Sequence, residues 1–183
     1  LGVGSAEVVG MSSGSGDMDN SGDVILFSSA EDGQAKATGL DAQGGANVVN
    51  SGGTYVAVIS EGDAKAYGAQ QDGGSLVNTG VIDVAAVGEE STEVVGVAAS
   101  GGASIDNQGD IYAASDTGPA SEAAGVKLTE GSSLTNSGTI QADQLTPLKD
   151  ASAANGVVVE NGGTVVNSGT IQGLQYAVLS KGE

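Results

Sequence analysis

Ser133-Leu134-Thr135-Asn136-Ser137-Gly138-Thr139-Ile140 is one copy of a short motif that recurs along the whole chain. In every copy the asparagine is followed by a small or polar residue and then by glycine. A nearly constant period of this length is typical of solenoids and other repeat arrays. The repeat therefore predicts a single domain over residues 1–183. Its coils are centred on six asparagines, 28 to 31 residues apart: Asn20, Asn50, Asn78, Asn107, Asn136 and Asn167.

Apolar residues occupy fixed positions around each asparagine. They lie two residues before it and four and six residues after it, and a spacing of two is the side-chain period of a β-strand. The column four residues after the asparagine is Val24, Thr54, Ile82, Ile111, Ile140 and Ile171. Glycine pairs such as Gly44-Gly45 and Gly73-Gly74 separate the apolar segments and predict turns, because glycine adopts positive φ without steric cost.

Each repeat thus reads as three short strands joined by three turns. Matching columns in every repeat predict an all-β fold, a parallel β-helix of about six coils of about 29 residues each. Stacking at about 4.8 Å per coil would give a rod roughly 30 Å long. We interpret the asparagine column as structural, since stacked amides can hydrogen-bond from coil to coil at an inward corner.

A second glycine column lies ten or eleven residues before the asparagines and raises a question of side-chain direction. Its members are Gly10, Gly39, Gly68, Gly96, Gly125 and Gly156. Apolar residues occur both two positions before each glycine and one position after it, which are positions of opposite parity on a strand. A bulge or bend at the glycine would reconcile them.

Composition and charge narrow the classes of function. The chain has 32 glycines, five aromatic residues, no cysteine, and a net charge of −18 from 23 acidic residues and five lysines. Such acidity argues against nucleic acid and against an anionic membrane surface as partners. It suits either solubility or a cation-binding face. No apolar run is long enough to cross a membrane. Leu1-Gly2-Val3-Gly4 is not a signal peptide, so we expect a fragment of a longer mature protein.

The sequence predicts no catalytic centre and no cofactor. Without histidine or cysteine there is no Ser/His/Asp or Cys/His nucleophile system. Acidic pairs such as Asp17 and Asp19 lie in Gly/Ser-rich turns without aromatic residues to hold a sugar, so a carbohydrate-active enzyme is a remote alternative. Acidic loops such as Glu89-Glu90 leave weak Ca²⁺ binding open.

Four residues are candidates for contact with a partner. Tyr55 and Tyr112 are expected on the outer face of the third strands, although Asp83 lies between them in the stack. The longest insertion, in the fifth coil, carries Leu145 and Leu148, which the core does not need. These leucines could form a small contact knob or pack against a neighbouring turn.

The units around Asn136 and Val165-Val166-Asn167-Ser168-Gly169-Thr170-Ile171 resemble the repeats of bacterial autotransporter passenger domains, including pertactin-like and haemagglutinin-like secreted β-helices. The resemblance covers essentially the whole chain. It implies a right-handed β-helix exported to the bacterial surface and attached to the outer membrane through a translocator domain outside this chain. The function it implies is a non-enzymatic adhesin body or stalk that binds a protein or glycan on a host or neighbouring cell. Self-association into cell aggregates, a surface layer or a biofilm is the alternative.

Overall fold

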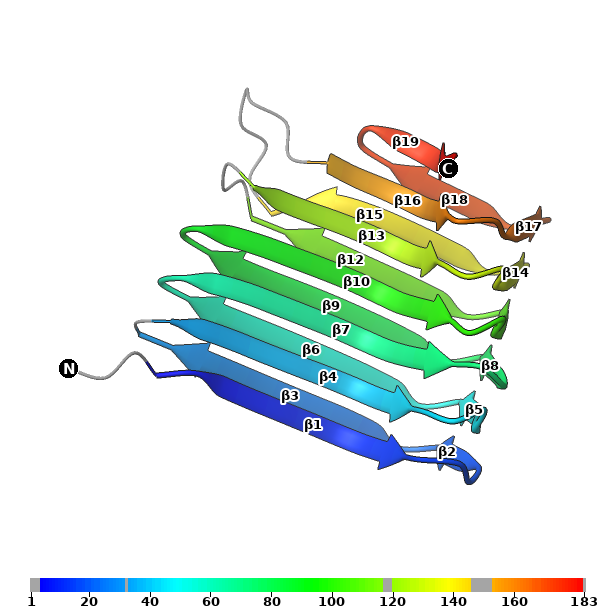
Figure 1. Ribbon diagram of the computed structural model, residues 1–183, viewed down its shortest axis with the longest axis horizontal. Helices are drawn as coiled ribbons and strands as arrows, with labels where there is room; N and C mark the ends of the chain where they lie inside the picture. Colours follow the sequence, from blue (N-terminus) through cyan, green and yellow to red (C-terminus); the bar gives the residue numbers. More distant parts are fainter. Residues whose placement is uncertain (1–3, 32, 117–119, 146–152, 183) are drawn as a thin grey trace.

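The computed structural model describes residues 4–31, 33–116, 120–145 and 153–182, and every regular element in these ranges is a β-strand. Successive strands fall in turn into three sheets, A, B and C, in which all pairs are parallel. The chain is therefore a parallel β-solenoid with three strands per coil and about 29 residues per coil, as predicted. Figure 1 shows sheets A and C as two long layers, with the short strands of sheet B at one narrow edge.

The strands of each sheet follow the chain from one end of the stack to the other. Sheet A contains β1 (Ala6–Ser13), β4 (Gln34–Ala42), β7 (Asp63–Asp72), β10 (Ser91–Ser100), β13 (Ser121–Leu128), β16 (Ala153–Glu160) and β19 (Tyr176–Lys181). Sheet B contains β2 (Met18–Asn20), β5 (Asn47–Asn50), β8 (Ser75–Asn78), β11 (Ser104–Asn107), β14 (Ser133–Asn136) and β17 (Thr164–Asn167). Sheet C contains β3 (Asp23–Ala30), β6 (Gly53–Ser60), β9 (Val81–Gly88), β12 (Asp110–Ser115), β15 (Thr139–Gln144) and β18 (Thr170–Gly173).

The asparagines form the predicted ladder at the end of sheet B. In the first five asparagines Nδ2 donates a hydrogen bond to Oδ1 of the asparagine in the next coil, and all five of these bonds are 2.7 Å long. Asn50, Asn78, Asn107 and Asn136 are fully buried, so the ladder satisfies amides that would otherwise be costly to bury. The asparagine column therefore holds the coils in register and offers nothing to a ligand.

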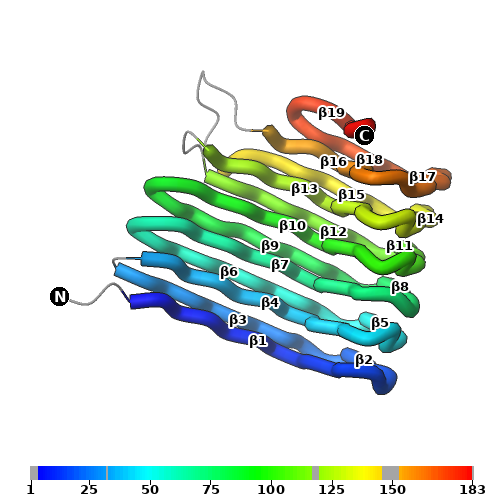
Figure 2. Tube along the Cα trace, in the orientation of Figure 1, coloured from blue at the N-terminus to red at the C-terminus, as the bar shows by residue number. Residues whose placement is uncertain are grey.

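The core is the narrow space between sheets A and C. It is filled by small and β-branched residues, with Leu40, Ile82, Ile111, Leu128 and Ile140 among the largest fully buried side chains. Each such residue contributes about 1.5–3 kcal/mol when it is buried. The chain winds steadily along the stack, so its two ends lie at opposite ends of the solenoid (Figure 2).

The upstream glycines lie where the two long sheets come closest. A Cβ built at Gly96 would lie 2.4 Å from Cγ2 of Ile111 on sheet C and 2.4 Å from the carbonyl oxygen of Gly125. Inward-pointing side chains alternate along the strand, but the alternation shifts by one residue at this column. Ala37 and Leu40 are therefore both fully buried although they are three residues apart. The predicted bend at the glycine is thus confirmed, and its cause is the close approach of the sheet A backbone to the β-branched column of sheet C.

The predicted turns between sheets A and B are also present. Gly44, Gly45, Gly73 and Gly74 have φ between 62° and 81°. L-residues rarely adopt this conformation, so the glycine pairs are needed for the chain to turn from one sheet into the next.

Candidate partner-binding site

The bend in sheet A creates a shallow groove on its outer face. The residue before each upstream glycine points outward into this groove, yet Thr38 and Val95 are only 1% and 3% exposed. The column along the groove floor is Val9, Thr38, Tyr67, Val95, Ala124, Asn155 and Tyr176. We call this strip and its two flanking columns the sheet-A groove.

Two cavities lie in the sheet-A groove and share part of their lining. The larger has a volume of about 570 Å³ and is lined mainly by polar residues, including Tyr67, Gln70 and Asp72. The smaller has a volume of about 160 Å³ and lies over β10, β13, β16 and β19. Glu93 and Lys127 line both cavities, so the groove is continuous across several coils.

The flanks of the groove carry ion pairs that bridge neighbouring coils. Four lysines lie in the described part of the chain, and all are on sheet A. Their pairs are Lys36–Glu7 at 3.1 Å, Lys65–Glu93 at 3.8 Å, Lys127–Glu160 at 3.6 Å and Lys181–Glu160 at 3.0 Å. Exposed pairs of this kind contribute little stability, so their main effect is to position side chains along the groove.

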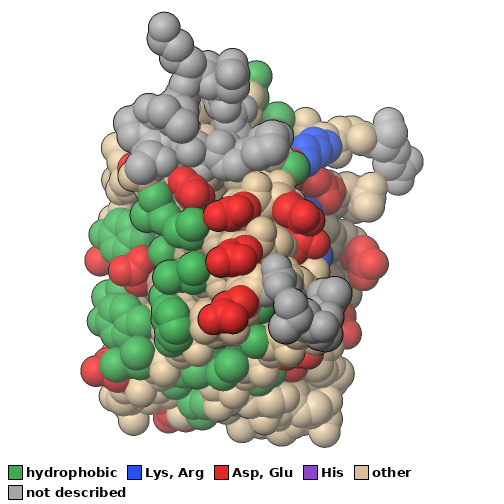
Figure 3. All heavy atoms as spheres, turned by 90° about the vertical axis from the view of Figure 1, so that its left-hand side faces the viewer, with side chains coloured by type: hydrophobic (Ala, Val, Ile, Leu, Met, Phe, Trp, Pro, Cys, Tyr) green, Lys and Arg blue, Asp and Glu red, His purple; other side chains and the backbone are tan. Residues whose placement is uncertain are grey.

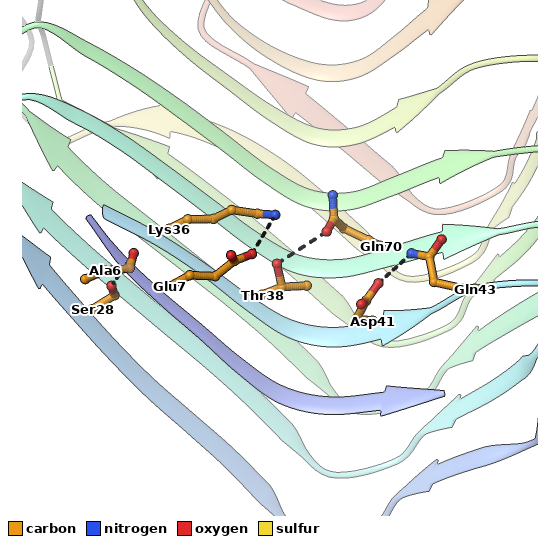
Figure 4. A network of polar contacts seen from close by, with 8 residues as sticks. All are labelled: Ala6, Glu7, Ser28, Lys36, Thr38, Asp41, Gln43 and Gln70. Atoms are coloured by element: carbon orange, nitrogen blue, oxygen red, sulfur yellow. Dashed lines mark hydrogen bonds and ion pairs between the residues drawn. The ribbon is translucent and has the colours of Figure 1, made fainter. Parts of the chain in front are cut away.

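The first coils show how densely polar this face is. Figure 4 shows the Lys36–Glu7 pair beside the 3.3 Å hydrogen bond from the Thr38 hydroxyl to Gln70 Oε1. These contacts join β1 to β4 and β4 to β7 and therefore run along the axis of the solenoid. A ligand that followed the groove would meet donors and acceptors in every coil.

Tyr67 and Glu93 form a hydrogen-bonded pair in the larger cavity. Burial raises the pKa of the Tyr67 phenol well above its ordinary value, and the negative charge and hydrogen bond of Glu93 raise it further. Tyr67 therefore stays a neutral hydroxyl that donates to the carboxylate. At the end of the groove, the hydrogen bond from Lys181 lowers the pKa of Glu160 and raises that of Lys181.

Sheet C presents a different outer face. Ile25, Phe27, Ile59 and Tyr55 are 73%, 61%, 50% and 38% exposed, and Ile25 and Tyr55 line a cavity of about 210 Å³ with Asp83. We call the five residues the sheet-C face. Burial raises the pKa of the Asp83 carboxyl. The view of the turn edge in Figure 3 shows hydrophobic side chains gathered toward one side and acidic side chains along the edge.

The predicted contact residues are spread over the molecule. Tyr55 and Tyr112 both pair in register with Asp83, which confirms that the carboxylate separates the two rings. Leu145 follows β15 and is 47% exposed, with its backbone N–H bonded to the carbonyl of Ser115 at 2.9 Å. Leu148 lies outside the described residues. Tyr55 and Leu145 belong to different coils, so the four residues remain separate predictions.

Within the described residues, the acidic turns form no metal centre. Glu89 and Glu90 are exposed between β9 and β10. In residues 4–31, 33–116, 120–145 and 153–182, no group of three or more acidic side chains is arranged to hold a metal ion. Nor does any helix long and apolar enough to cross a membrane occur in these ranges.

The sequence-based prediction did not identify the sheet-A groove, although two signals for it were present. One was the mismatch of parity around the glycine column, which places the residue before the glycine on the outer face. The other was the alignment of Lys36 and Lys65 at the same position of successive repeats. Together they indicate an outward polar face with a bend along its middle.

A protein-family model matches almost the whole chain, over residues 5–180. The family is described as the N-terminal part of hyphally regulated cell wall proteins. The chain belongs to this family. No curated protein and no solved structure matches it.

Membership of the hyphally regulated cell wall family supports only part of the expected resemblance. The family is of fungal cell wall type, and a cell wall protein belongs at the surface or among secreted proteins. The resemblance to autotransporter passengers is confirmed only in the β-solenoid and in the surface setting. The bacterial origin and the outer-membrane translocator are not confirmed.

Proposed function

We propose that this member of the hyphally regulated cell wall family is a non-enzymatic adhesion module. In this proposal the sheet-A groove binds a protein or glycan on a host or neighbouring cell. The observation that carries the proposal is the continuous groove, whose two cavities meet at Glu93 and Lys127. Family membership supports the setting, since a surface protein meets other cells first.

Rigidity suits the solenoid to this task. Neighbouring coils are joined by three parallel sheets and by the asparagine ladder, so the groove keeps a fixed shape along the axis. A groove that is already formed binds without a large cost in ordering. The partner would therefore meet an almost unchanged surface.

The absence of an enzyme activity remains part of the proposal. It is supported by the lack of histidine and cysteine in the sequence. The proposal also excludes nucleic acid as a partner, because a chain with a net charge of −18 repels the phosphate backbone. Attachment through a bacterial outer-membrane translocator stays a prediction that the family match does not support.

The adhesion proposal is tested with beads coated with the chain, on the organism's own cells and on cultured epithelial cells. The double variant Tyr67→Thr/Glu93→Gln changes the middle of the groove, and threonine already occupies the same column at position 38. We expect bead adhesion to fall about tenfold, because loss of a hot-spot contact at the centre of an interface costs more than about 1 kcal/mol.

The matched control is Tyr112→Thr/Asp110→Asn, which makes the same kind of change on the outer face of sheet C and leaves Asp83 unaltered. This variant should adhere like the unaltered chain. Urea midpoints for both variants show whether the fold is retained. Equal adhesion by the groove variant and the unaltered chain would refute the proposal.

Self-association through the sheet-C face is a second candidate function. Its supporting observation is the exposure of Ile25, Phe27 and Ile59 on adjacent strands β3 and β6. Pairing of two such faces would remove this apolar surface from water. The charge of Asp83, beside Tyr55, opposes such pairing at neutral pH.

This second function predicts a pH dependence of assembly. Because burial raises the pKa of Asp83, the carboxyl takes up a proton earlier than an exposed one as the pH falls. Above that pKa the negative charge of Asp83 opposes the pairing of two sheet-C faces. Below that pKa the carboxyl is neutral and no longer opposes the pairing. Sedimentation velocity should therefore show stronger association at acidic pH, and Asp83→Asn should associate already at pH 7. Phe27→Ser should abolish the association, and a monomer at every pH would exclude this function.

A further inference from the structure

The smaller cavity of the sheet-A groove has the properties of a ligand pocket. Its floor is formed by Val95, Ala124 and Asn155, each at least nine-tenths buried. Val158 and Leu179 form an apolar wall. Its volume of about 160 Å³ is close to that of a cavity that holds one six-membered ring.

The pocket exists because a small residue occupies the floor column at this point. The column holds Tyr67 two coils before Ala124 and Tyr176 two coils after it, whereas the three positions between them carry the smaller residues Val95, Ala124 and Asn155. The bend that places this column at the bottom of a groove is the same in each coil. The small side chain of Ala124 therefore leaves room for the pocket between its neighbours in the column.

Asn155 gives the pocket floor an unpartnered polar group. Its Oδ1 atom is buried and accepts no hydrogen bond. The other buried side-chain oxygens without a partner in the described residues do not line this pocket: those of Gln71, Thr92, Ser115 and Ser121. Buried polar atoms are rarely left unpaired, so a donor on a bound molecule would satisfy this oxygen.

Charges of both signs line the pocket, and its two lysines are already paired with Glu160, which favours a neutral ligand. Glu93 and Glu122 lie on one side, and Lys127 and Lys181 lie on the other. A cation would meet the two ammonium groups and an anion the two carboxylates. A neutral molecule with several hydroxyl groups can use both kinds of partner.

We propose that this pocket binds one pyranose ring of a neutral glycan. A ring hydroxyl donates to Asn155 Oδ1, other hydroxyls reach Glu122 and Lys127, and the C–H face packs against Val158 and Leu179. The proposal rests on the adhesion function and names the ligand class of the same groove. The other part of the groove, around Tyr67, would hold neighbouring sugar units.

The experiment uses the purified chain and five small molecules. Three are neutral sugars: methyl α-mannopyranoside, methyl β-glucopyranoside and N-acetylglucosamine. The other two are Nα-acetyl-lysine methylamide as a cation and inorganic phosphate as an anion. NMR titration follows the Ala124 and Leu179 methyl groups. We expect at least one neutral sugar to shift both signals with a Kd in the millimolar range, as is usual for a ligand making few contacts.

Variants separate the pocket from the rest of the face. Ala124→Tyr, followed through the Leu179 methyl groups, should raise the Kd at least tenfold, because it places in the pocket the residue that position 67 already carries. Asn155→Leu should raise it about tenfold through loss of the acceptor. The control is Val9→Tyr, a change in the same column at a position 43% exposed and outside the pocket, which should leave the Kd unchanged.

Several outcomes would overturn the saccharide pocket. These are no shift with any neutral sugar at tens of millimolar, tighter binding of the lysine derivative or phosphate, or full sugar binding by Ala124→Tyr. If beads still adhere through Tyr67 and Glu93 while no sugar binds, the adhesion function stands and the saccharide pocket fails. If a sugar binds at Ala124 while the Tyr67→Thr/Glu93→Gln variant adheres normally, the pocket stands and the adhesion function fails.

Discussion

Replacing Ile111 with aspartate should unfold the solenoid at neutral pH. Ile111 is fully buried between Ile82 and Ile140 of the neighbouring coils and faces Gly96 across the core. A carboxylate at this position would have no cation within the core and would also lose the packing of the isoleucine. We expect a loss of more than about 4 kcal/mol, which would be large relative to the stability of an ordinary domain. Urea unfolding followed by circular dichroism measures the loss.

Ile111→Val is the control for this prediction. It keeps the β-branched shape and removes one methylene, so it should cost only about 0.5–1.5 kcal/mol. An aspartate variant with the urea midpoint of the unaltered chain would contradict the placement of Ile111 in the core.

A methyl group added at Gly96 should destabilise the fold by about 2–3 kcal/mol. The new Cβ of Gly96→Ala would lie 2.4 Å from both the Gly125 carbonyl oxygen and Ile111 Cγ2, so sheet A must move away from sheet C. Trimming Ile111 to alanine in the same chain should not restore stability, because the backbone contact with Gly125 remains. Thermal and urea unfolding of the single and double variants measure both effects.

Gly22→Ala is the matched control, since nothing lies within 4 Å of a Cβ at that glycine. It should change the unfolding free energy by less than about 0.5 kcal/mol. A similar loss for Gly22→Ala and Gly96→Ala would mean that chain flexibility, and not the close approach of the two sheets, explains the glycine column.

Most of the fold could be predicted from the sequence because every coil of a solenoid forms from the same local sequence pattern. The Asn-x-Gly motif, the apolar columns and the glycine pairs each correspond to an observed feature: the amide ladder, the core between sheets A and C, and the positive-φ turns. Each column has a member in each of the six repeats, so one irregular member such as Thr54 does not hide the pattern. Even the bend at the upstream glycines followed from the parity of the residues around them.

The candidate site was harder to predict because it depends on a small side chain at one position of the groove floor. The pocket arises from Ala124, an ordinary residue in a strand rich in alanine and valine. Its importance appears only when the outward column is known to lie at the bottom of a bend. Tyr55 and Tyr112, which were predicted to contact a partner, lie on sheet C, whereas Tyr67 lies in the groove on sheet A. Aromatic type alone does not show which sheet a residue faces.

The coil-on-coil arrangement also determines how the molecule responds to tension. The chain ends lie at opposite ends of the stack, and the hydrogen bonds between coils run along the direction in which the ends would be pulled. Tension would therefore peel an end coil from its neighbour and then stop at the next intact pair of coils. Each released coil of about 29 residues would supply roughly 100 Å of extended chain. A solenoid built this way would lengthen in steps under load while the coils that remain stacked keep the shape of their groove.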